Sequence, residues 1–137
     1  MLSDDADFVV VFDGGSLNNP GHGYGSFQLR ALGDAPVIHR LDYGDGVTSN
    51  EAEYRTLLAA LERALEEARA AGRDPRALRF LAYGDSQLVV NQVAGRWGVK
   101  AANLRPLRDR ARELLGAFGS GEVRWHPRAR SVAALGH

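Results

Sequence analysis

Short runs of β-branched and aromatic residues alternate with turn-forming clusters in the first third of the chain. DFVVVFD, over residues 7–13, predicts a buried strand that ends on an acid. The GGSLNNPG segment that follows is rich in turn formers and predicts a turn. Residues 24–32 and 35–43 predict two further strands, separated by Gly33 and Asp34. Together these three segments indicate an antiparallel meander.

A helical period replaces this pattern after residue 50. Over residues 51–72, leucine and alanine recur at intervals of three and four positions, which predicts an amphipathic helix. Ser49 or Asn50 can cap its start, and Gly72 stands where the helix should stop. Five shorter segments follow: predicted strands at 78–85 and 121–127, predicted helices at 86–95 and 104–118, and one or two helical turns within 130–137. The strand at 121–127 has the alternation of an edge or half-buried strand.

The order of these elements predicts the fold class. A meander followed by alternating helices and strands is typical of an α/β protein with a mixed sheet and helices packed on its faces. The chain has 137 residues and shows no internal repeat, linker or low-complexity stretch. We therefore expect a single domain over residues 1–137.

Composition excludes several classes of site and bears on the location and partner of the protein. The absence of cysteine excludes disulfides and thiolate metal sites. No stretch reaches 18 apolar residues and no secretory signal is visible, so we expect a cytoplasmic protein without a membrane span. The formal net charge is zero, which argues mildly against a nucleic-acid partner.

The distribution of charge is more informative than the total. Residues 1–53 carry nine acids against two arginines, whereas residues 96–130 carry nine basic residues against three acids. An acidic half and a basic half would suit a site that holds cations and also grips phosphates. Chance segregation on solvated faces would give the same pattern, so charge alone does not decide between the two interpretations.

Three acids are candidates for metal ligands. Asp13 and Asp85 each end a predicted strand, and the carboxyl ends of neighbouring strands meet at one edge of an α/β sheet, where Glu53 of the long helix could join them. Converging carboxylates suit hard divalent cations such as Mg²⁺, and two such ions about 3.5–4 Å apart can drive phosphodiester cleavage by water. Each acid also has a simpler explanation: Asp13 as a turn residue, Asp85 as a helix cap and Glu53 as the partner in a capping box.

Four sequence blocks, taken in order, resemble the type 1 ribonuclease H family in its short form without a basic protrusion. The blocks are FDGGSLNNPGHGYG, TSNEAEYRTLLAAL, YGDSQLVVNQVAGRWGVK and a late WHPR, and together they span residues 7 to about 130. The resemblance implies a ribonuclease H-like fold, with a five-stranded mixed sheet made of an antiparallel meander and parallel strands. It also implies endonucleolytic hydrolysis of the RNA strand of RNA–DNA hybrids by a two-metal mechanism, with water as the nucleophile.

The same resemblance assigns roles to individual residues. Asp13, Glu53 and Asp85 would hold Mg²⁺ or Mn²⁺ and carry catalysis. Residues implied to contact the hybrid are Gly14, Gly15 and Ser16 through backbone beside the RNA strand, Asn19, Asn50 and Gln87 at bases or sugars, Trp97 and Lys100 at the DNA strand, and Arg128 at a phosphate. The residues allow other interpretations: Asn19 and Asn50 as turn and cap residues, Trp97 as a core aromatic, and Arg128 as a salt-bridge partner.

The last block departs from the family pattern. The position of the family's fourth acid is Leu135, and the position of an expected asparagine is Ser131. Three interpretations follow. The enzyme works with three acids and a weaker second metal, with a preference for Mn²⁺. Alternatively, His126 or His137 replaces the missing ligand, or catalysis is lost and only hybrid binding remains. His22 is expected on the surface.

Two other functions therefore stay open beside the hybrid nuclease. The first is a catalytically weak or inactive protein that binds hybrids or double-stranded RNA, and the second is a 3′–5′ exonuclease with the same fold. Retention of three clustered acids argues against a pure binder, because negative charge beside phosphates weakens binding. We expect the RNA–DNA hybrid as the partner and a monomeric protein.

Overall fold

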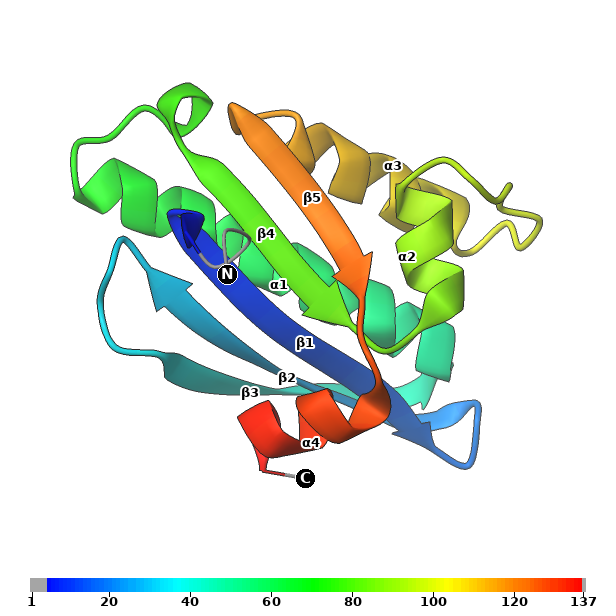
Figure 1. Cartoon of the computed structure of the whole chain (residues 1–137). Coiled ribbons are helices and arrows are strands. Elements are labelled where there is room, and N and C mark those ends of the chain that lie inside the picture. The colour runs from blue at the N-terminus through cyan, green and yellow to red at the C-terminus, as the bar shows by residue number, and fades with distance from the viewer. Residues whose placement is uncertain (1–4, 137) are drawn as a thin grey trace.

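The computed structural model of the chain describes residues 5–136 and is built around one five-stranded sheet (Figure 1). The strands are β1 (Phe8–Leu17), β2 (Gly21–Ala31), β3 (Val37–Val47), β4 (Arg79–Gly84) and β5 (Ser120–Trp125). Their order in the sheet is β3-β2-β1-β4-β5, with an antiparallel meander of β1 to β3 and with β4 and β5 parallel to β1. The mixed sheet expected from the sequence is confirmed, and β5 lies at an edge as its alternation predicted.

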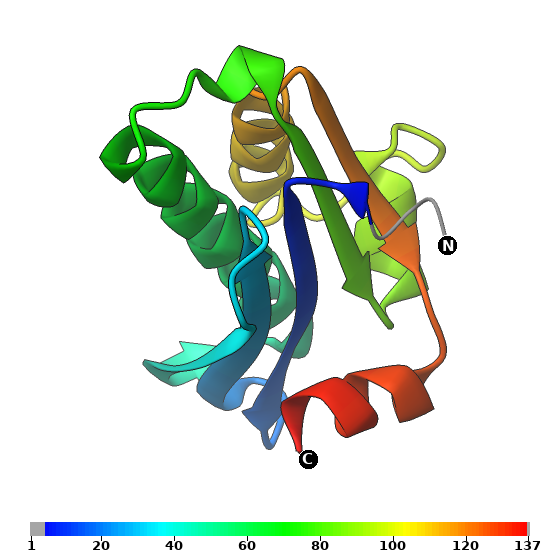
Figure 2. The same cartoon turned by 60° about the vertical axis from the view of Figure 1, so that its left-hand side comes forward.

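The helices divide unequally between the two faces of the sheet. They are α1 (Ser49–Ala70), the 3₁₀ turn η2 (Pro75–Ala77), α2 (Gln87–Val93), α3 (Arg105–Leu115) and α4 (Arg128–Leu135). Helices α1 and α3 cover one face, whereas α4 crosses the other face near the carboxyl end of β1 (Figures 1 and 2). Side chains of the meander hold α4 there, since Gln28 Nε2 donates to the Ala134 carbonyl and Arg40 donates to the Leu135 carbonyl.

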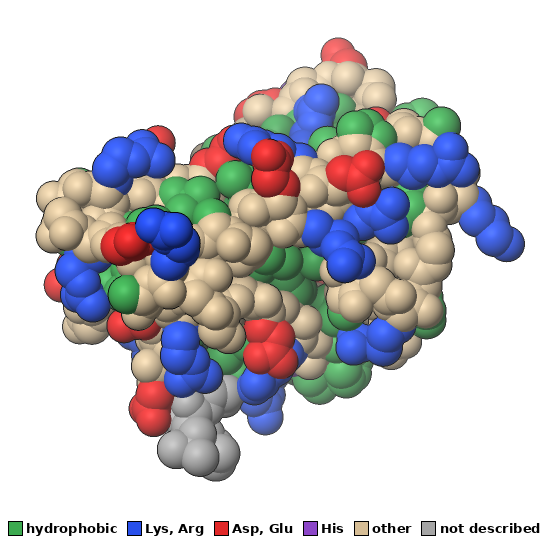
Figure 3. Space-filling model, turned by 90° about the horizontal axis from the view of Figure 1, so that it is seen from above, with side chains coloured by type: hydrophobic (Ala, Val, Ile, Leu, Met, Phe, Trp, Pro, Cys, Tyr) green, Lys and Arg blue, Asp and Glu red, His purple; other side chains and the backbone are tan. Residues whose placement is uncertain are grey.

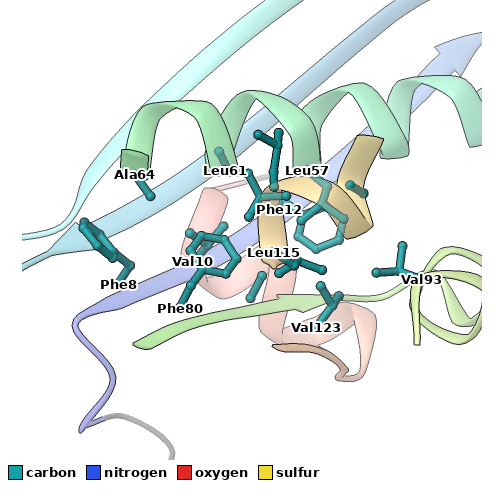
Figure 4. Close-up of a cluster of buried hydrophobic side chains, with 14 of the residues drawn as sticks. Phe8, Val10, Phe12, Leu57, Leu61, Ala64, Phe80, Val93, Leu115 and Val123 are labelled. Carbon is teal, nitrogen blue, oxygen red and sulfur yellow. The ribbon is translucent and has the colours of Figure 1, made fainter. Parts of the chain in front are cut away.

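The main core lies between β1, β4 and the long helix α1 (Figure 4). Phe8, Val10 and Phe12 alternate along β1 and are fully buried, where they meet Leu57 and Leu61 of α1. Burying each of these side chains contributes roughly 1.5–3 kcal/mol. Because side chains alternate along a strand, the next residues divide between the two faces: Asp13 points toward the α4 side and Gly14 toward α1.

Strand β1 is longer than the sequence pattern predicts. It continues through Gly14, Gly15 and Ser16 to Leu17, with each residue paired to β2, and the turn is confined to residues 18–20. The prediction of a turn beginning at Gly14 was wrong. The turn-forming composition was overridden because pairing with β2 satisfies the backbone groups of this segment. Strand β3 is likewise shifted, to Val37–Val47 instead of 35–43.

The N-cap of α1 lies one residue before Ser49 and two before Asn50, the two predicted caps. Thr48 is the N-cap, and its side chain accepts a hydrogen bond from the Glu51 backbone N–H while the Glu51 side chain accepts one from the Thr48 N–H. This capping box contributes about 1 kcal/mol. Glu51 is its acidic partner, so the interpretation of Glu53 as a capping residue was wrong.

Charged side chains of both signs are spread over the face of the molecule seen in Figure 3. In Figure 3, Lys and Arg gather on the side where α3 and the loop after α2 lie, with acidic side chains among them. Several of these arginines are paired locally, as in Arg108–Asp109 at 2.7 Å and Arg110–Glu113 at 2.6 Å. Local pairing thus offsets part of the basic excess that the sequence shows. None of the helices within residues 5–136 combines the length and apolarity needed to cross a membrane.

Candidate active site

Three carboxylates meet where the parallel pairing between β1 and β4 ends. Asp13 lies in β1 and Asp85 directly follows β4, and these strands are neighbours paired up to Phe12 and Gly84. Glu53 enters from the first turns of α1. One oxygen from each of the three residues lies within 4.8 Å of the others. The convergence expected from the sequence is therefore confirmed.

Gly14 makes this approach possible. A Cβ at this position would lie 2.5 Å from the Ala52 carbonyl carbon and oxygen and 2.7 Å from the Glu53 nitrogen. The Gly14 backbone N–H donates to Glu53 Oε1 at 2.7 Å, which fixes the glutamate beside Asp13. The close backbone contact between β1 and α1 therefore requires glycine at this position. A turn is not the reason, because the segment is part of a strand.

The electrostatics of the cluster fit a bound cation. Burial raises the pKa of the Glu53 carboxyl well above its usual range, and the neighbouring Asp13 carboxyl raises it further. The pKa of Asp85 is also raised, by burial and by the Asp13 charge, although Arg128 opposes this rise. Glu53 Oε2 is buried and has no hydrogen-bond partner. A buried oxygen without a partner is costly, and a divalent ion held by oxygen ligands would remove that cost.

The carboxylates line an open cleft of about 310 Å³. Among the residues expected to contact substrate, those that line the cleft are Gly14, Gly15, Ser16, Asn50 and Arg128. The sequence analysis missed three further lining residues: Tyr24, Ser49 and Ser86. Tyr24 is the cross-strand partner of Gly15. Finding it would have required the strand register, which the sequence pattern alone does not give.

Four other expected contact residues lie outside this cleft. Asn19 Oδ1 accepts a hydrogen bond from the Ser49 N–H and thereby ties the β1–β2 turn to the start of α1. Gln87 and Lys100 are exposed. Trp97 is 47% exposed, so its interpretation as a core aromatic was wrong.

The cap and turn interpretations of the two strand-end acids also fail. Asp13 lies within β1, paired with Ser26, and does not start a turn. Ser86 caps α2, since its hydroxyl accepts from the Val89 N–H, so Asp85 is not the capping residue. Both carboxylates are thus available to the cleft. Arg128 makes the salt bridge that the sequence left open, with its guanidinium 3.5 Å from Asp85 Oδ2.

Within residues 5–136, no histidine belongs to the carboxylate cluster. Leu135 is fully buried at the end of α4 and offers no side-chain oxygen. His126 is outside the carboxylate cluster, and its Nε2 is hydrogen bonded to the Ser131 hydroxyl at 2.8 Å. His137 lies outside the described residues. His22 is partly exposed, as expected, and is paired with Asp42 and Asp45.

The mixed sheet, with α4 on one face and a carboxylate cluster at the ends of its central strands, defines the ribonuclease H fold class. The chain belongs to the reverse transcriptase-like family, whose model matches residues 13–135. It is 40% identical over 128 residues to ribonuclease HI of Halobacterium salinarum, and 36% identical over 127 residues to a bifunctional protein of Mycobacterium tuberculosis. These matches cover 91% and 92% of this chain, but only 59% and 33% of the two relatives.

Solved structures agree with this assignment. Ribonuclease H1 of Halobacterium salinarum matches with a TM-score of 0.77 at 36% identity, over 93% of this chain and 90% of that chain. The N-terminal ribonuclease H domain of the mycobacterial protein gives a TM-score of 0.75 at 32% identity, over 95% of this chain and 88% of that one. LC11 ribonuclease H1, solved with an RNA/DNA hybrid, matches at 22% identity with a TM-score of 0.76, over 93% and 90% of the two chains, and this likeness shows the fold alone.

Proposed function

We propose that this chain hydrolyses the RNA strand of RNA–DNA hybrids at internal positions, with water as the nucleophile. Asp13, Glu53 and Asp85 would hold the Mg²⁺ or Mn²⁺ ions. The observation that carries the proposal is the buried, unpartnered Glu53 Oε2 beside two further carboxylates in an open cleft. The relatives support it, because one is named ribonuclease HI and a structure with the same fold holds an RNA/DNA hybrid.

The chain's own residues have separable tasks in this proposal. Bound divalent ions would activate water and stabilise the leaving oxygen. Asp13 within β1 and Asp85 directly after β4 would hold these ions, and the Gly14 N–H holds Glu53 in place. The backbone of Gly15 lies open in the cleft, where the 2′-hydroxyls of an A-like minor groove could reach it.

The residues outside the cleft have roles in binding. Arg128, with a largely exposed side chain, is placed to contact a phosphate. Asn19 and Gln87 would contact the hybrid beside the cleft, and Trp97 and Lys100 would contact the DNA strand. All three carboxylates come from one copy of the chain, so we also propose that a monomer is sufficient.

The test is cleavage of an end-labelled RNA–DNA hybrid in Mg²⁺ and in Mn²⁺. We expect internal cuts that leave 5′-phosphates, and loss of cutting in Asp13→Asn, Glu53→Gln and Asp85→Asn. Glu66→Gln is the matched control, because Glu66 is an exposed acid on the same helix as Glu53. Equal cutting by wild type and Asp13→Asn would remove the assignment. Stepwise shortening from the 3′ end would instead indicate an exonuclease.

One observation favours a second function, binding of hybrids without cleavage. Leu135 occupies the position where the family resemblance places a fourth acid, and it is fully buried. Tight hybrid binding with no cleavage in either metal would support this alternative. Cleavage that is stronger in Mn²⁺ than in Mg²⁺ would support the three-acid nuclease.

A further inference from the structure

Tyr24 is a side chain of the cleft that the proposed reaction does not yet use. It lies in β2, lines the same cleft as the three carboxylates, and is 37% exposed. Within residues 5–136 its hydroxyl has no hydrogen-bond partner. The hydroxyl is therefore available to a molecule bound in the cleft.

The tyrosine ring reaches across to the neighbouring strand. Tyr24 is directly opposite Gly15 of β1 in the antiparallel pair. A Cβ at Gly15 would lie 2.6 Å from Tyr24 Oη and 2.8 Å from Cζ. The hydroxyl end of the ring therefore occupies the place that a side chain of residue 15 would take, beside the Gly15 backbone that also lines the cleft.

This place is on the same face of β1 as the side chain of Asp13. Residues two apart along a strand point to the same face and lie about 7 Å apart. Cross-strand partners share a face as well, so the Tyr24 hydroxyl stands on this face one side-chain position along from Asp13. Nucleotides follow one another at about 3.4 Å along a duplex axis. A strand with a phosphate at the carboxylates would therefore bring a neighbouring sugar close to this hydroxyl.

A hydroxyl in this setting matches a sugar hydroxyl more closely than a phosphate. The phenol both donates and accepts hydrogen bonds, and so does the ribose 2′-hydroxyl. A phosphate is matched by a cation, and the cleft supplies one in Arg128. The 2′-hydroxyl is also the group by which a protein distinguishes RNA from DNA.

We propose that Tyr24 is a specificity-determining residue, whose hydroxyl binds a ribose 2′-hydroxyl of the RNA strand at a nucleotide beside the cleaved phosphate. The inference rests on the proposed function, since it takes the hybrid to be the substrate. The competing explanation is structural, because an aromatic ring that covers a glycine on the next strand stabilises the pair. Phenylalanine would cover Gly15 equally well, so removal of the hydroxyl alone separates the two explanations.

The test measures how a single 2′-deoxynucleotide in the RNA strand changes hybrid binding. The substrate is a short labelled hybrid that wild type cuts at one position, and a series of variants carries the 2′-deoxy substitution at each nucleotide around that position. Affinity is measured by fluorescence anisotropy with Asp85→Asn in every protein, which keeps the hybrid uncut. With Tyr24 present, we expect a nucleotide beside the cut at which the substitution weakens binding about 3–10-fold, the loss of one hydrogen bond.

The Tyr24→Phe variant should remove this effect at that nucleotide alone. It should bind the unsubstituted hybrid about 3–10-fold more weakly, and the 2′-deoxy substitution should then cost nothing further, because the same hydrogen bond is already lost. Any losses at other nucleotides should remain as in the protein with Tyr24.

Thermal melting and a second tyrosine supply the controls. Tyr24→Phe should melt at the wild-type temperature, because its ring still covers Gly15, whereas Tyr24→Ala should melt lower. Tyr83→Phe removes a hydroxyl outside the cleft, from a ring that stacks on His126. This control should change neither the affinity for the hybrid nor the effect of any 2′-deoxy substitution.

Two results would overturn the inference and leave the proposed function standing, provided that wild type cuts the hybrid. The first is a Tyr24→Phe variant that keeps every loss caused by 2′-deoxy substitution. The second is a Tyr24→Phe variant whose affinity falls equally for the hybrid and for an all-DNA duplex, which would indicate a contact with the phosphate backbone. Wild type that neither binds nor cuts a hybrid would overturn the proposed function and this inference with it.

Discussion

The contact between Gly14 and α1 gives the sharpest test of the carboxylate geometry. In Gly14→Ala the added Cβ would lie 2.5 Å from the Ala52 carbonyl, whereas ordinary contacts of a Cβ begin near 3.4 Å. The start of α1 must then move by about 0.9 Å, because the neighbour is backbone and no flexible side chain can yield. That displacement carries Glu53 away from Asp13 and stretches its hydrogen bond to the Gly14 N–H.

The expected loss is large because metal sites tolerate only about 0.2 Å of error in ligand distance. A misplacement near 1 Å in an active site costs on the order of 10²-fold in rate. Overpacking also costs roughly 1–3 kcal/mol of stability. We therefore expect Gly14→Ala to fold, to melt several degrees lower, and to cut the hybrid about 100-fold more slowly with weaker Mn²⁺ binding.

The assay combines single-turnover hybrid cleavage, Mn²⁺ titration and thermal melting on the same preparation. Gly116→Ala is the matched control, since its φ of −68° is helical and an added Cβ would meet its nearest neighbour at 3.4 Å. It should retain wild-type cleavage. Gly14→Ala with turnover and Mn²⁺ affinity within about twofold of wild type would refute the argument that this close approach positions Glu53.

Four further outcomes are expected. Burial raises the pKa of Glu53, so in EDTA the wild type loses stability as the pH rises from the ordinary carboxyl pKa toward the raised pKa of the folded state. Glu53→Gln should therefore melt at a higher temperature than wild type at pH 8 and at the same temperature at pH 4. Equal melting temperatures at both pH values would contradict this. Leu135→Asp should speed cleavage in Mn²⁺ but lower the melting temperature in EDTA, because it buries a carboxylate without a partner; an unchanged rate would argue against a fourth ligand position there. Lys100→Ala should weaken hybrid binding and reduce the slope of log affinity against log salt by about one, and an unchanged slope would exclude a phosphate contact. Thr48→Ala should lose about 1 kcal/mol in urea unfolding with cleavage retained, and no loss would mean that the capping box is not stabilising.

The order of elements could be predicted from the sequence because its causes are local. The continuous apolar run of residues 8–12 specifies a buried strand, and the leucine period after residue 50 specifies a helix with one buried stripe. The three acids could also be proposed, since Asp13 and Asp85 each end a predicted strand and Glu53 lies near the start of the predicted long helix. The boundaries were less accurate, because pairing between strands, which is not local, decided that β1 continues to Leu17.

The contacts that make the cleft were decided only in three dimensions. Tyr24 and Ser49 line it through strand register and helix placement, and neither has a signal in the linear pattern. The cap of α1 fell on Thr48 because two reciprocal hydrogen bonds with Glu51 formed there, which left Glu53 free for the cluster. N-cap propensity alone does not separate Thr48 from Ser49 or Asn50, because all three residue types are favoured at an N-cap.

The sequence by itself determined which residues carry charge, which faces are apolar and in what order the elements follow, because these depend on neighbours a few positions apart. The tertiary structure decided that Asp13, Glu53 and Asp85 share one site. These contacts join residues 32 to 72 positions apart, and no local pattern encodes a distance across the fold.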